Sequence, residues 1–61
     1  MNKSEQREAS NIVKYASMGM LDTAARAASA LYRSARTVKS QDEILALALA
    51  YKLVSLPDFI I

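Results

Sequence analysis

Apolar residues recur with the period of an α-helix in two neighbouring segments, residues 4–18 and residues 21–36. Spacings of three and four residues place side chains on one face of a helix. Between the segments stands the only glycine, Gly19, which readily takes the positive φ that ends a helix. The sequence therefore predicts a hairpin of two helices. Their apolar faces consist of Ala9, Ile12, Val13 and Ala16 in the first helix, and of Leu21, Ala24, Ala25, Ala28, Leu31, Tyr32 and Ala35 in the second.

A third segment, residues 41–55, has apolar side chains on nearly every side. Between Ile44 and Val54 the only charged residue is Lys52. Alanine and leucine dominate the segment and are the strongest helix formers, so we expect a helix and not a strand. A helix that is apolar nearly all round must be covered nearly all round. We expect the rest of the chain, or a partner, to supply that cover.

Local signals predict where this third helix begins and ends. Ser40 followed three residues later by Glu43 is typical of a helix start. Pro57 disfavours helical geometry at the residue before it, so the helix is expected to stop near Ser55. The apolar tail, residues 56–61, either folds back on the hairpin or docks on a second chain.

Together these elements predict an all-α protein with one domain over residues 1–61, a helical hairpin plus a hydrophobic third helix. A chain of 61 residues buries only about 60% of its unfolded surface and is marginally stable alone. Small proteins usually add disulfides, a metal or oligomerisation, and this sequence has no Cys and no His. We therefore expect the three-helix domain to be completed by oligomerisation, with a symmetric dimer favoured.

Two surfaces are predicted to meet partners. The first is an oligomer or partner interface on the third helix and the tail, formed by Leu45, Leu47, Leu49, Leu53, Val54, Phe59, Ile60 and Ile61. The second lies off the apolar faces of the hairpin and consists of Tyr15, Met18, Arg26, Arg33 and Arg36.

Basic residues gather in the second helix, although the net charge is only +2. Four bases and no acids lie between Thr23 and Ser40, namely Arg26, Arg33, Arg36 and Lys39. Such a stripe faces solvent, an acidic protein or nucleic-acid phosphate. Four charges without interleaved aromatic residues favour solvent. A helix-turn-helix is the nearest DNA-binding arrangement, but Asp22 and Thr23 would offer few hydrogen bonds to bases at the start of its reading helix.

Nothing in the sequence resembles catalytic machinery. There is no His or Cys and no glycine-rich phosphate loop, and no serine has a basic partner that would activate it. The acidic pairs Glu5/Glu8 and Asp42/Glu43 stand in first helical turns, where carboxylates favour the helix dipole. We therefore expect no enzymatic activity, no cofactor, no bound metal and no small-molecule substrate.

The pattern Tyr15-x3-Gly19-x4-Ala24-x3-Ala28 resembles part of one tetratricopeptide repeat, in which an aromatic residue, a turn glycine and small residues let two helices pack closely. The resemblance spans about residues 12–35 and implies a helical hairpin with a partner-binding side. The chain departs from the repeat where a Trp-Leu-Gly signature is expected, and Ala28 replaces a large aromatic residue.

The lengths of the apolar runs also indicate where the protein is located, and the whole pattern limits what it can do. The longest apolar run, residues 44–54, is shorter than the ~20 residues that span a bilayer, and no apolar stretch follows the first charges as in a signal peptide. We expect a cytoplasmic, non-enzymatic protein-interaction module: an adaptor, inhibitor, regulator or chaperone-like subunit that binds stoichiometrically as a homodimer or with a partner protein. The alternative is a small basic helical regulator that binds nucleic acid.

Overall fold

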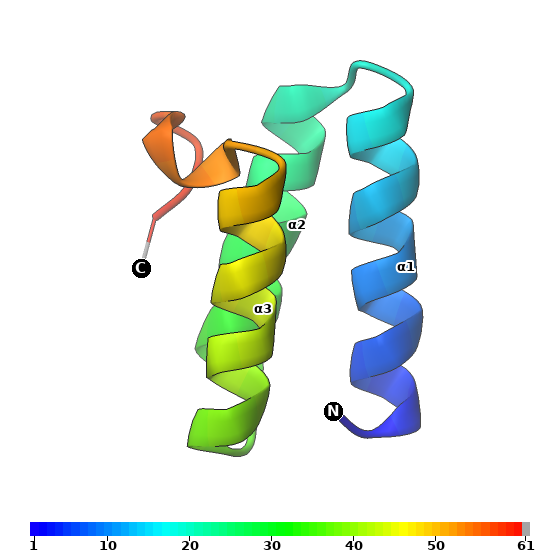
Figure 1. Cartoon of the computed structure of the whole chain (residues 1–61), viewed down its shortest axis with the longest axis vertical. Helices are drawn as coiled ribbons and strands as arrows, with labels where there is room; N and C mark the ends of the chain where they lie inside the picture. Colours follow the sequence, from blue (N-terminus) through cyan, green and yellow to red (C-terminus); the bar gives the residue numbers. More distant parts are fainter. Residues whose placement is uncertain (61) are drawn as a thin grey trace.

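The computed structural model describes residues 1–60, which form helices α1 (Lys3–Ser17), α2 (Leu21–Ser34) and α3 (Val38–Ala50) and a short 3-10 helix, η1 (Leu53–Ser55). Figure 1 shows α1 and α3 running upward and α2 running downward, antiparallel to both. Both α1 and α3 pack against α2. Residues 1–60 contain no strand, and the predicted all-α class is confirmed.

A capping box begins α1. The side-chain oxygen of Asn2 accepts a hydrogen bond from the Glu5 backbone N–H at 2.8 Å, and the Glu5 carboxylate accepts one from the Asn2 N–H at 2.9 Å. These reciprocal bonds satisfy two donors that a helix start otherwise leaves unpaired. Asn2 is therefore the residue that caps α1.

Gly19 ends α1 as the sequence predicts, with φ of 80°. Its N–H donates to Ala16 O at 3.1 Å, and the Met20 N–H donates to Tyr15 O at 2.9 Å. This pair of bonds is a Schellman motif, which requires a left-handed residue after the helix. The turn reverses the chain and places α2 antiparallel to α1 (Figure 1).

The buried core follows the inner face of α2, where three alanines are completely hidden from solvent. Because alanine side chains are short, the neighbouring helices can lie close to the α2 backbone. The other elements each contribute larger apolar side chains. The core consists of Ala24, Ala25, Ala28 and Leu31 from α2, Ala9 and Ile12 from α1, Ile44 and Ala48 from α3, and Leu53 from η1.

The third helix begins three residues earlier than the predicted residue 41. Thr37 is its cap, because the Thr37 hydroxyl oxygen accepts a hydrogen bond from the Ser40 N–H at 3.0 Å. Ser40 therefore lies in the first turn of α3 and Glu43 in the second, so the pair does not mark the start, and neither Asp42 nor Glu43 stands in the first turn as expected. The helix before it, predicted to reach residue 36, ends at Ser34.

The end of α3 also differs from the prediction. The helix stops at Ala50, not near Ser55, and Lys52 takes a left-handed conformation with φ of 60°. The Lys52 N–H donates to Leu49 O at 3.0 Å. Leu53 then turns inward and is fully buried. Burial of this leucine favours the break, although no residue near it is a typical helix terminator.

The C-terminal segment, residues 53–60, lies back against α2. The Ile60 N–H donates to the Ser29 hydroxyl oxygen at 2.7 Å, and Arg26 Nε lies 3.7 Å from Asp58 Oδ2. Of the two predicted arrangements of the tail, the structure has the folded-back one up to residue 60. Ser29 of α2 is consequently buried beneath the segment.

Candidate functional site

The residues predicted to form an interface do not share one environment. Leu53 belongs to the chain's own core and has no exposed surface left for a partner. Ile61 lies outside the described residues. The others are half-buried (Leu45, Leu47, Val54 and Phe59) or exposed (Leu49 and Ile60).

The second predicted surface comes from two helices. Met18 is exposed at the end of α1, whereas Tyr15 packs partly against the core. All three arginines of the set are exposed, Arg26 and Arg33 on α2 and Arg36 in the connection that follows it. Of these, Arg26 lies beside Asp58, whose carboxylate reduces the positive charge available there. The basic stripe therefore offers mainly Arg33, Arg36 and Lys39.

An apolar groove of about 500 Å³ lies between α1 and α3. Val13 and Ala9 line it from α1, and Leu47 and Ala46 line it from α3. The groove exists because both helices pack on α2 and leave a channel along the side where they face each other. Clefts with a mainly apolar lining and a few polar groups are the usual form of a binding site.

Polar groups lie at the end of this groove nearest to the start of α1. The amino group of Met1 lies 3.3 Å from Glu43 Oε1, and the Gln6 side chain donates to Met1 O at 3.0 Å. The ion pair connects the start of the chain to α3. Ser10 is the remaining polar residue of the lining. The groove thus combines an apolar length with a charged end.

The outer side of α3 continues the apolar surface away from the groove. Leu49 is 56% exposed and Val38 is 71% exposed, and both Ala46 and Ala50 face solvent. The chain therefore leaves one side of α3 uncovered. The sequence predicts that a partner covers whatever part of this helix the chain leaves exposed. The uncovered side of α3 and the groove beside it form the candidate site.

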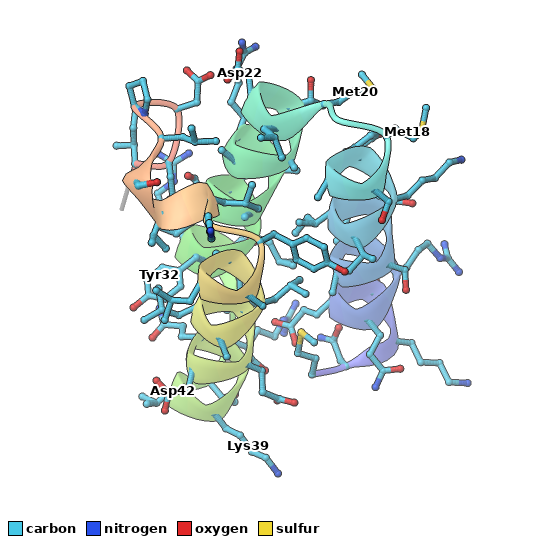
Figure 2. The ribbon with its side chains drawn as sticks, turned by 45° about the horizontal axis from the view of Figure 1, so that its top comes forward. Met18, Met20, Asp22, Tyr32, Lys39 and Asp42 are labelled. Atoms are coloured by element: carbon cyan, nitrogen blue, oxygen red, sulfur yellow. The ribbon has the colours of Figure 1, made fainter. Side chains whose placement is uncertain are left out.

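A smaller apolar cluster lies at the tip of the hairpin. Met18, Met20 and Leu21 are all exposed around Gly19. Figure 2 shows the Met18 and Met20 side chains pointing away from the bundle at this end. The side chain of Asp42 lies near the opposite end of the molecule (Figure 2), so this cluster is separate from the start of α3.

The carboxylate of Glu5 joins the three helices at the end of the bundle where α1 and α3 begin and α2 ends. Glu5 is only 7% exposed, and its pKa lies below the ordinary value mainly because its carboxylate accepts a hydrogen bond from the Asn2 backbone. Bonds from the Arg36 N–H and the Ser40 hydroxyl act in the same direction, whereas burial opposes them. These hydrogen bonds give Glu5 a structural role, since they join it to the residue that caps α1, to a residue of α3 and to the connection between α2 and α3.

Two further findings concern residues 1–60. No group of three or more acidic residues in this part of the chain is arranged to hold a metal ion. Within the same residues, every helix is too short or too polar to cross a bilayer.

Neither the groove nor the contact between Glu5 and Ser40 follows from the sequence pattern. Val13 and Ala9 have the spacing of core residues, and only the observed gap between α1 and α3 makes them groove residues. One signal was available: Ala46 and Ala50 alternate with leucines on α3, and short side chains on an outer face leave room for a neighbour.

Comparison with known proteins adds no relative: no protein-family model, curated protein or solved structure matches the chain. The partial tetratricopeptide pattern thus has no matching family model behind it.

Proposed function

We propose that this chain is a small cytoplasmic protein-interaction module that binds another protein chain stoichiometrically and performs no catalysis. It acts as an adaptor, inhibitor, regulator or chaperone-like subunit, either as a homodimer or with a partner protein. The groove between α1 and α3 is the observation that carries this proposal, because its apolar walls and charged end suit a protein segment.

A helical segment fits the shape and chemistry of this groove best. Helix-in-groove recognition places the apolar face of an amphipathic helix between two receptor helices. Here the walls are made of short and medium apolar side chains, and Leu49 extends the apolar surface beyond the wall formed by α3. Tyr51, also exposed, follows α3 directly and adds the kind of aromatic residue that is enriched in interfaces.

The proposal is tested by a photo-cross-linking amino acid placed in turn at two exposed alanines. Ala46 lines the groove, while Ala30 is exposed on the outer side of α2. In cells that produce the protein, we expect the probe at Ala46 to give a discrete cross-linked product and the probe at Ala30 to give none. The mass of the product separates a second copy of the chain from a different protein.

A matched pair of substitutions supplies the second measurement. Ala46→Arg fills the groove with a charged side chain, and Ala30→Arg adds the same charge elsewhere. The proposal requires that only the first weakens the association found by cross-linking, while both variants keep the wild-type melting curve. Equal products from both probes, or none from either, would overturn it.

A further inference from the structure

The chain reverses within a stretch that favours a continuous helix. Residues 44–56 contain neither glycine nor proline, yet α3 stops at Ala50 and Lys52 has φ of 60°. A left-handed residue with a Cβ atom is crowded by the following carbonyl oxygen. The local preference of the sequence and the observed conformation therefore disagree at this one residue.

Tertiary contacts of the C-terminal segment compensate for this disagreement. Leu53 is fully buried, and Phe59 packs partly against the core. The Ile60 N–H reaches the Ser29 hydroxyl at 2.7 Å, and Asp58 lies 3.7 Å from Arg26. All these contacts join residues 53–60 to helices that precede the turn. None of them requires the segment and the helices to belong to one chain.

We propose that the C-terminal segment exchanges between two copies of this chain. Lys52 takes a helical conformation, α3 continues through residues 51 and 52, and residues 53–60 of each copy pack on α2 and α3 of the other. A second copy is the only partner that carries both the same segment and the same acceptor surface. The exchange keeps every contact of the segment and relieves the left-handed residue twice in each dimer. Exchange of an identical element is a low-cost route to a dimer.

The exchanged dimer also covers apolar surface near the turn. Leu49 and Tyr51 are exposed in the single chain, and they flank the residue that straightens. In a symmetric exchange the two straightened turns meet near the two-fold axis, so these side chains gain neighbours. The exchange does not use the groove and depends only on the turn and the segment, so it describes one way to form the homodimer of the proposed function and would stand even if the groove bound nothing.

Substitutions at Lys52 test the proposal through the oligomeric state. Lys52→Gly permits the left-handed turn without crowding and disfavours the straight helix. Its dimer association constant is expected to fall by about tenfold or more, because both effects act at two turns. Lys52→Asn should fall between glycine and lysine. Lys39→Asn, on the exposed first turn of α3, removes the same charge and should leave dimerisation unchanged.

The measurement is sedimentation velocity with light scattering after long incubation at about 10 µM to about 1 mM protein. A wild-type dimer that weakens in the order lysine, asparagine, glycine supports exchange. A wild-type chain that stays monomeric at the highest concentration would overturn it, as would a Lys52→Gly variant that dimerises as strongly as wild type. Melting curves confirm that each variant is folded.

Cross-linking then identifies which chain supplies the segment. The natural sequence has no cysteine, so an Arg26→Cys/Asp58→Cys variant carries one thiol on α2 and one on the segment. A short bismaleimide should join the two thiols within a chain in the monomer fraction and between chains in the dimer fraction. Linkage within one chain in the dimer fraction would contradict the exchange. It would indicate a dimer in which each chain keeps its own C-terminal segment.

Discussion

The carboxylate of Glu5, in the first turn of α1, accepts a hydrogen bond of 3.2 Å from the hydroxyl of Ser40 in α3. The same side chain completes the capping box with Asn2 and accepts a 3.3 Å bond from the Arg36 N–H after α2. One charged group therefore connects the start of α1, the end of α2 and the start of α3. Hydrogen bonds to an ionised acceptor are stronger than bonds between neutral groups.

The stability of the protein should consequently depend on pH in the acid range. The pKa of Glu5 in the folded chain lies below the ordinary value of about 4.5, so the unfolded state binds a proton at higher pH than the folded state. Stability from the ionised carboxylate is complete above about pH 4.5 and is lost as the pH falls through the lower, folded-state pKa. Urea denaturation at successive pH values between about 7 and about 2 measures this loss.

Glu5→Gln is the matching variant. It should lower the urea midpoint at neutral pH and reduce the fall in stability on acidification. Glu8→Gln changes an exposed carboxylate in the same helix and serves as the control. If both variants followed the wild-type pH profile, the connecting role of Glu5 would be wrong.

Gly19→Ala tests the turn of the hairpin. A Cβ atom added at Gly19 would meet nothing within 4 Å, so the backbone conformation with φ of 80° is the only source of strain. We expect a loss of about 1–2 kcal/mol, equivalent to a fall in Tm of about 4–8 °C for each kcal/mol in a domain of this size. Gly19→Asn should lose less, since asparagine tolerates this region. An alanine variant as stable as wild type would rule out the strain argument.

Two apolar residues of α3 should differ sharply in their contribution to folding. Ile44 is completely buried, and Ile44→Ala should destabilise the chain by about 2–5 kcal/mol. Leu49 is mainly exposed, and Leu49→Ala should change the free energy of unfolding by less than about 0.5 kcal/mol. Urea denaturation of the two variants provides the comparison. A large loss from Leu49→Ala in the monomer would show that this side of α3 is covered after all.

The hairpin was predictable from the sequence because its signals are local. The spacing of apolar residues located α1 and α2, and a glycine at the correct position marked the turn. The end of α3 was not predictable, because Lys52 gives no local indication of a left-handed conformation. The residue that decides the break is Leu53, and its burial depends on residues of α2 and α3 that only the folded chain brings together.

The candidate site was less accessible to sequence reasoning than the fold. The pattern assigned Leu49 and Leu53 to one surface, whereas the chain leaves Leu49 exposed and buries Leu53 completely. Both assignments came from treating residues 41–55 as one straight helix. The groove depends on the distance between α1 and α3, which no periodicity within one segment can specify.

The basic stripe, which runs from α2 to the start of α3, yields a test of the nucleic-acid alternative. With Arg26 beside Asp58, the exposed bases that remain are Arg33, Arg36 and Lys39. Any binding to duplex DNA should then weaken with salt at a slope of log K against log salt no steeper than about −3. An Arg33→Ala/Arg36→Ala variant should abolish that binding and leave cross-linking through the groove intact. A steeper slope would favour a nucleic-acid regulator over a protein-interaction module.

The alanines of α2 have an effect on a surface that they do not touch. Ala24, Ala25 and Ala28 are hidden behind the two outer helices and take no part in lining the groove. Their methyl groups nevertheless act as the spacers on which α1 and α3 rest. A bulkier side chain at any of these positions would push the outer helices apart from behind, so the width of the channel is governed by residues that a bound molecule would never meet.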